Sequence, residues 1–268
     1  MDVVRFCGPI SISGRFAIMI DPSILLLHVS AFVASFFQAV TGIGFGMIAG
    51  PVILMVLEDP GAVVISTLMS ALVAYVLFPL VYRGTNWRLA GRLLVGAVIG
   101  LPIGVGLLAL ADIQTLKLGA GLAIAILTAL MLFGAPGTDK PGWTGDLVFG
   151  GLGGIFGGAL AMPGPTAALR AAALGHKKAE VRASMMGFFV GVWPMILAAQ
   201  WIALDIKTQT FWNAASLMPA TLAGLAVGNY AASKVSESFF RRVVIVLLIA
   251  TSASLMGNVI WVWMGEAP

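Results

Sequence analysis

The stretch Ser23–Leu57, SILLLHVSAFVASFFQAVTGIGFGMIAGPVILMVL, decides the fold class of this chain. It is an apolar run of 35 residues whose one interruption is the glycine-rich segment 41–46. A helix rises 1.5 Å per residue, so about 20 residues cross a hydrocarbon core of about 30 Å. The run is therefore too long for one membrane span and too short for two comfortable ones.

The glycine-rich segment divides this run into two unequal arms. The first arm, Ser23 to Thr41, is long enough to cross the membrane, whereas the second, Phe45 to Leu57, has only 13 residues. We therefore predict a helix that enters the membrane, breaks at the glycines and returns to its own side. Irregular backbone survives at membrane depth only where protein buries it or where it lines a wet cavity, and broken helices of this kind build transporter binding sites.

The composition indicates the same class of protein. Hydrophobic residues make up 60% of the chain, charged residues 10%, and the mean hydropathy is +1.03. A soluble globular domain has about 25% charged residues, so the 268 residues are expected to form one integral membrane domain. The net charge of +4 is attributed to Arg and Lys in loops, and not to nucleic-acid binding. Cys7 is the only cysteine, which excludes an intramolecular disulfide.

The apolar pattern occurs twice along the chain. After the first run come apolar segments at 61–82, 89–110 and 115–134, and then a polar linker at 135–146. The second half restarts with the run 147–174, which is broken at 161–165, and continues with segments at 180–204, 209–233 and 239–263. We expect an all-α integral membrane protein of two repeats, each a broken, re-entrant-like helical hairpin plus three transmembrane helices. The expected units are an interfacial segment at 1–22, repeat 1 at 23–134, the linker at 135–146, repeat 2 at 147–263 and a tail at 264–268.

The basic residues predict how the two repeats are oriented. If each broken run returns to its own side, eleven Arg and Lys residues fall on one face and four on the other. This bias makes the richer face cytoplasmic, with the loops 83–92, 135–146, 175–182 and 234–242, and makes the repeats inverted with both termini external. Two full crossings per hairpin give the same loop sides, and arm length favours re-entry.

Several motifs resemble those of one known family. Gly42-Ile-Gly-Phe-Gly46, with Pro51 in the arm that follows and Asn86-Trp-Arg88 opening a later helix, is similar to the sulfite exporter TauE/SafE family, also called the toluene-sulfonate uptake permeases. Phe45 stands where the family's early signature has a glycine, and the second copy, 161–165, keeps one glycine and adds two prolines. The resemblance implies a multi-pass transporter of the cytoplasmic (inner) membrane that carries a small sulfur-containing anion, such as sulfite, sulfoacetate or another organosulfonate.

The residues point to a compatible anion site. Arms that begin at Phe45 and Pro165 place two helix N-termini near mid-membrane, where unpaired N–H groups and the positive end of the helix dipole attract anions. The expected site combines residues at the two breaks with nearby polar side chains: Thr41, Gly42, Gly44, Phe45, Gly46, Pro163, Gly164, Pro165, Thr166, Ser66, Thr67, Ser184, Gln38 and Arg170. The alternative role of the hydroxyls is hydrogen bonding between helices, and that of Arg170 is snorkelling to the cytoplasmic interface.

Other polar patterns are weaker. Gly96, Gly100 and Gly104 are expected to form a helix-packing face, and Trp193 could line a cavity. The sequence has neither a catalytic dyad nor a metal cluster, so we do not expect an enzyme or a cofactor. The expected partners are a small anion and the lipid bilayer, with a homodimer left open and no nucleic acid. An anion channel, or a permease for another small organic anion, is the alternative function.

Overall fold

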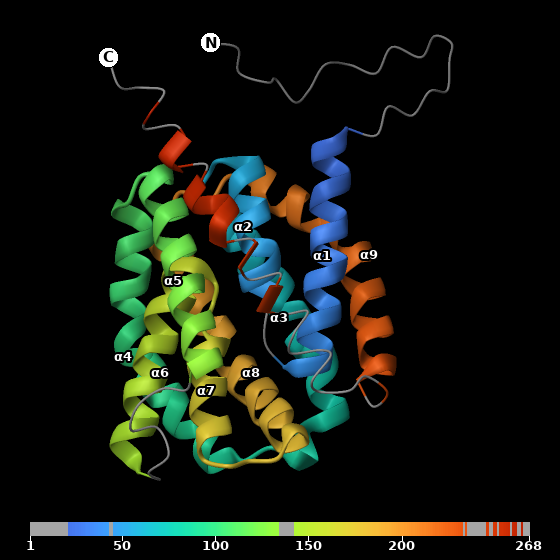
Figure 1. The fold of residues 1–268 in the computed structure, drawn as a ribbon, viewed down its shortest axis with the longest axis vertical. Coiled ribbons are helices and arrows are strands. Elements are labelled where there is room, and N and C mark those ends of the chain that lie inside the picture. The colour runs from blue at the N-terminus through green and yellow to red at the C-terminus, as the bar shows by residue number, and fades with distance from the viewer. Residues whose placement is uncertain are drawn as a thin grey trace.

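The structure is a computed structural model that describes residues 21–42, 45–133, 142–232 and 234, together with 245–246, 249–250, 252–257, 259–261 and 264 (Figure 1). The elements in chain order are α1 (Pro22–Thr41), α2 (Phe45–Leu57), α3 (Gly61–Val81), the short 3-10 helix η1 (Tyr82–Gly84), α4 (Trp87–Leu110), α5 (Ile113–Phe133), α6 (Trp143–Leu160), α7 (Gly164–Ala173), α8 (Lys178–Ala203) and α9 (Thr208–Ala231). Every element in the described ranges is therefore helical, as the sequence predicts. The described residues between 245 and 264 are helical as well.

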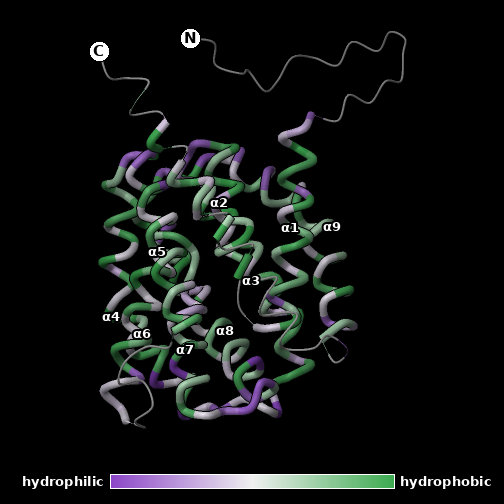
Figure 2. The backbone as a smooth tube through the Cα atoms, viewed as in Figure 1, coloured by the Kyte–Doolittle hydropathy of each residue, from purple (hydrophilic) through white to green (hydrophobic). Residues whose placement is uncertain are grey.

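Five of the described helices, α1, α3, α4, α5 and α8, are long and apolar enough to cross a membrane. In Figure 2, the hydrophobic residues dominate the middle of the bundle, and the hydrophilic ones collect at its two ends. The helices α6 and α9 are not in this set: α6 is rich in glycine, and α9 carries Asn, Gln and Thr side chains. The helix α6 contacts α4 extensively, and α9 contacts α1 in the same way.

The first predicted break is present between α1 and α2. Gly42 follows α1 with φ of +84°, and its N–H donates to the carbonyl oxygen of Gln38 at 2.8 Å. Glycine adopts this left-handed conformation without steric cost, and it commonly ends helices. The helix α2 then begins at Phe45 and has the predicted bounds, whereas α1 begins at Pro22, one residue before the predicted start. Ile43 and Gly44, which lie between them, are outside the described residues.

The second break has the same form without a glycine. Ala161 follows α6 with φ of 57°, and its N–H bonds to the carbonyl oxygen of Gly157 at 3.0 Å. The next arm, α7, begins at Gly164, one residue before the predicted start, and has 10 residues. The helix α6 begins at Trp143, inside the expected linker 135–146. Residues 135–141 of that linker lie outside the described ranges.

The two ends of the bundle are marked by polar contacts. The turn between α2 and α3 and the start of α5 lie at the upper end of Figure 1. In this region Lys117 of α5 bonds to Glu58, and Lys207 bonds to Asp59 at 3.0 Å. At the lower end, the loop between η1 and α4 contacts the first turns of α8 through Asn86, whose N–H donates to Ser184 Oγ at 2.9 Å. The helix α1 starts at the upper end, whereas α6 starts at the lower end (Figure 1).

Small residues hold α4 against α6, and the expected glycine face is confirmed. A Cβ atom built on Gly96, Gly100 or Gly104 would clash with backbone carbonyl groups of α6, and for Gly100 it would lie 2.8 Å from the carbonyl carbon of Gly151. Glycines of α6 face α4 in the same way; a Cβ atom on Gly154 would lie 2.9 Å from the Ala97 carbonyl carbon. Small residues allow such close backbone approach between membrane helices.

The helices α1 and α9 form a second contact of this kind. A Cβ atom on Gly224 would lie 2.9 Å from the carbonyl carbon of Phe32, and one on Gly228 would lie 2.9 Å from Cα of Phe36. In both helix pairs, α4 with α6 and α1 with α9, the residue numbers of the contacting positions increase in the same direction along the two helices. The paired helices therefore run in parallel. The first helix of each half thus packs on the corresponding later helix of the other half.

Candidate anion-binding site

The two helix breaks, far apart in the sequence, meet inside the bundle. A Cβ atom built on Gly46, in the first turn of α2, would lie 2.9 Å from the carbonyl carbon of Ala161 and 3.4 Å from Cγ of Met162. The first of these distances is shorter than any normal carbon contact and involves backbone, which cannot move aside as a side chain can. Glycine at position 46 therefore allows the two tips to touch.

A small cavity lies where the tips meet. Its volume is about 10 Å³, close to what one water molecule needs. It is lined by residues of α1, α2, α3, the second break, α7 and α8: Gln38, Phe45, Gly46, Met47, Ser70, Ala161, Met162, Pro163, Gly164, Pro165, Phe189 and Trp193. Ser70 and Trp193 lie near the middle of α3 and α8, so this is a site deep within the bundle.

Three residues that line this cavity each have a buried polar atom without a hydrogen-bond partner: Gln38 Oε1, Ser70 Oγ and Trp193 Nε1. Their residues are only 1%, 1% and 2% exposed, so bulk water does not satisfy them. A buried polar atom without a partner costs about 1–3 kcal/mol, and native structures contain few of them. Three on one cavity wall indicate a place built to bind a polar species.

Helix N-termini add donors to the same cavity. The helix α2 begins at Phe45 and α7 begins at Gly164, and both residues line the cavity. The first N–H groups of a helix have no partner within the helix, and the helix dipole makes this end positive. Pro165 has no N–H, so it leaves this donor set smaller on the α7 side. The arrangement can bind an anion without any cationic side chain among the lining residues.

The expected site residues divide into two groups. Gln38, Phe45, Gly46, Pro163, Gly164 and Pro165 line the cavity, and Trp193 lines it too, as expected. Two expected hydroxyl residues of α3, Ser66 and Thr67, are not among the lining residues. Ser66 Oγ donates to the Ala62 carbonyl and Thr67 Oγ1 to the Val63 carbonyl, each at 2.9 Å. The hydroxyl protons of Ser66 and Thr67 are therefore used within their own helix.

Four more expected residues are not among those that line the cavity: Thr41, Gly42, Thr166 and Ser184. The hydroxyls of Thr41 and Thr166 donate to backbone carbonyls of Phe37 and Pro163, at 2.8 and 3.4 Å. Ser184 accepts the Asn86 N–H at the lower end of the bundle. Gly42 caps α1, and Gly44 lies outside the described residues.

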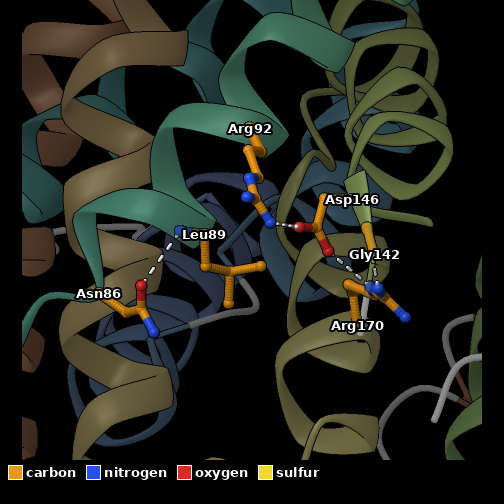
Figure 3. A network of polar contacts seen from close by, with 6 residues as sticks. All are labelled: Asn86, Leu89, Arg92, Gly142, Asp146 and Arg170. Carbon is orange, nitrogen blue, oxygen red and sulfur yellow. Dashed lines mark hydrogen bonds and ion pairs between the residues drawn. The ribbon is translucent and has the colours of Figure 1, made fainter. Parts of the chain in front are cut away.

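Arg170 has a structural setting that the sequence interpretation missed. Its side chain is fully buried, so it does not snorkel to an interface. Nε donates to Asp146 Oδ1 at 2.8 Å and Nη2 to the Gly142 carbonyl at 3.2 Å (Figure 3). Arg92 of α4 reaches the other oxygen of the same carboxylate at 3.2 Å. Asp146, expected in a linker, instead lies buried in the first turn of α6 and joins α4, α6 and α7.

Sequence reasoning also missed Ser70 and Phe189. Ser70 lies one helical turn after Ser66, and a single serine in an apolar helix is not distinctive in the sequence. Phe189 gave no signal, because an aromatic residue in an apolar helix is ordinary core. Among the described residues, none form a group of three His, Cys, Asp or Glu side chains that could hold a metal ion.

The comparison with known proteins identifies the family. No curated protein and no solved structure matches the chain. The model of the sulfite exporter TauE/SafE family matches residues 27–255, which include both helix breaks and every lining residue of the cavity. This match covers most of the 268 residues. The chain therefore belongs to the sulfite exporter TauE/SafE family.

Proposed function

We propose that this protein is a secondary transporter that binds a small sulfur-containing anion between the tips of its two broken helices. The observation that carries the proposal is the cavity with unpartnered Ser70 Oγ and Trp193 Nε1 beside two helix N-termini. Hydroxyl, indole and backbone N–H groups are hydrogen-bond donors that suit the oxygens of sulfite or a sulfonate. The family adds the sulfur-containing anion as the cargo.

The proposal includes two inverted repeats, at 23–134 and 147–263, each with a re-entrant hairpin. The contacts support it: α1 packs on α9 as α6 packs on α4, and α3 packs on α8 across the middle. If α1 is exchanged with α6, α3 with α8 and α4 with α9, this set of contacts stays the same. The opposite starting ends of α1 and α6 in Figure 1 also support inversion.

The proposed orientation puts the lower end of Figure 1 in the cytoplasm. Arg83, Arg88, Lys177 and Lys178 lie in or beside the loops of that end, whereas Lys117 and Lys207 lie at the other. Single cysteines are introduced in a background where Cys7 is replaced by serine. A cysteine at Asp112 should react in intact cells with a membrane-impermeant thiol reagent, and one at Lys177 only after permeabilisation. The reverse pattern would show that the orientation is wrong.

Alternating access is the mechanism that the cavity supports. At about 10 Å³ the cavity has room for about one water molecule and for no continuous water path, so the two helix tips must separate for an anion to enter. Counterflow in proteoliposomes tests this directly: internal unlabelled sulfite should drive uptake of labelled sulfite above its external level. A channel would equilibrate the label without such accumulation, and comparison with several organosulfonates would rank the substrates.

Two matched pairs of variants test the site. Gly46→Ala places its Cβ against the Ala161 backbone and should abolish transport. Gly50→Ala is the control on the same helix and should transport normally. Its Cβ would meet only Ser66 Oγ, Met162 Cε and the Leu160 carbonyl oxygen, at ordinary contact distances of 3.7–4.0 Å.

The second pair lies in α3. Ser70→Ala removes a donor from the cavity and should lower transport. Ser66→Ala removes a hydroxyl that bonds within its helix and should not. Equal effects within either pair would place the anion elsewhere.

A further inference from the structure

The cavity contains an acceptor among its donors, and this acceptor restricts which anion it can hold. We propose that the site selects a singly protonated oxyanion, with hydrogensulfite preferred to the sulfite dianion, because Gln38 Oε1 receives the proton of the bound anion. The inference rests on the proposed transport function. It concerns the protonation state of the cargo, which the family assignment does not specify.

The orientation of the Gln38 amide is fixed by its neighbour. Nε2 donates to the backbone carbonyl oxygen of Ser70 at 3.1 Å, and this carbonyl belongs to the helix α3. Rotating the amide by half a turn would set two oxygens against each other, so the hydrogen-bond network assigns the amide as it stands. Oε1 is therefore the atom left without a partner, and as a carbonyl oxygen it only accepts.

The surrounding groups complete the selection. Ser70 Oγ, Trp193 Nε1 and the N–H groups at the starts of α2 and α7 can donate to negatively charged oxygens. A fully ionised oxyanion offers no proton to Gln38 Oε1 and would be repelled by it. Hydrogensulfite offers one hydroxyl together with charged oxygens, so it can satisfy the acceptor and the donors at once.

The charge of the cavity favours the same species. No Lys or Arg is among the lining residues, and the buried Arg170 is engaged by Asp146. The cost of removing an ion from water rises with the square of its charge, so a dianion without a cation nearby is far costlier to bind than a monoanion. Among the described residues, no carboxylate lines the cavity either. The proton therefore crosses on the substrate, and transport of hydrogensulfite moves one proton with each sulfite.

The pH dependence of binding to the unmodified protein tests the proposal. Binding of total sulfite and of methanesulfonate, a monoanion without a titratable proton near neutral pH, is measured by calorimetry on the detergent-purified full chain. Above the pH at which hydrogensulfite ionises, the apparent Kd of total sulfite should rise about tenfold per pH unit, because only the protonated fraction binds. Methanesulfonate should bind with a Kd that does not follow this ionisation, and more weakly than hydrogensulfite.

One variant assigns the selection to Gln38. Gln38→Met keeps a similar length but removes the acceptor, and it should lower hydrogensulfite affinity about tenfold, to the level of methanesulfonate. Gln114→Met is the control, since Gln114 also has a buried unpartnered Oε1 but does not line the cavity; this variant should leave both affinities unchanged.

Three results would overturn the inference. Sulfite affinity that stays level or increases above the ionisation would show that the dianion binds. Methanesulfonate affinity equal to that of hydrogensulfite in the unmodified protein would show that Gln38 receives no proton and that the cavity holds a water molecule at this acceptor. If neither anion binds at any pH and neither is transported, the proposed function itself fails.

Discussion

Replacing Gly100 by alanine tests how α4 and α6 are held together. The built Cβ atom would lie 2.8 Å from the carbonyl carbon of Gly151 and 3.1 Å from the backbone nitrogen of Ile155. Carbon atoms normally approach to about 3.5–4.0 Å, so the two helices must separate by about 1 Å. Both neighbours are backbone atoms of a regular helix, so neither can rotate away, and the movement opens the contact along its length.

The magnitude follows from two opposing terms. Overpacking of this kind costs about 1–3 kcal/mol, and alanine favours the helix over glycine by about 1 kcal/mol. Gly106→Ala provides the matched control, because Gly106 lies on the same helix and a Cβ atom there meets nothing within 4 Å. The propensity term is common to both variants, so Gly100→Ala should be less stable than Gly106→Ala by about 1–3 kcal/mol.

The assay is chemical unfolding of the two purified variants side by side in detergent micelles. Gly100→Leu, with a larger side chain at the same point, should also lower the yield of folded protein. Equal stability of Gly100→Ala and Gly106→Ala would refute the reasoning, because it would mean that α4 and α6 do not touch at Gly100.

Three further predictions use the same unfolding assay. Ala161→Gly removes the steric cost of a left-handed alanine, about 1–2 kcal/mol, and loosens the unfolded chain by a smaller amount, so stability should be equal or slightly higher; a clear loss would show that the alanine methyl packs productively. Asp146→Asn removes the carboxylate that pairs with the buried Arg170, and it should lower the free energy of unfolding by about 3–5 kcal/mol. Adding Arg170→Met to this variant should restore part of the lost stability. If the double variant restores none of it, the two residues are not coupled. Hydrogen bonds from Thr115 lower the pKa of Asp112 below the ordinary value for an aspartate. The charge of Asp112 should therefore stabilise the fold at pH values above that ordinary pKa, and this stabilisation should be lost as the pH falls through the lowered pKa. Asp112→Asn should remove this pH dependence of stability, and an unchanged pH profile in the variant would contradict the prediction.

The sequence predicted the features that depend on local properties of the chain. The lengths of the arms at 22–41 and 45–57 follow from hydropathy and from the rise of a helix, and both appear in the structure. The break at Gly42 could be predicted from the sequence because glycine adopts the left-handed backbone conformation found there without steric cost. The spacing of Gly96, Gly100 and Gly104 indicated a packing face, since residues four apart share one side of a helix.

The tertiary structure decided which polar side chains act together. Ser66 and Ser70 lie one turn apart on the same helix, yet one hydroxyl bonds to its own backbone and the other reaches the cavity without a partner. Arg170 meets Asp146 because α6 and α7 pack side by side after the second break. Neither outcome is encoded in spacing along the chain. Each depends on how the helices rotate and approach, which the packing of the whole bundle fixes and hydropathy alone does not.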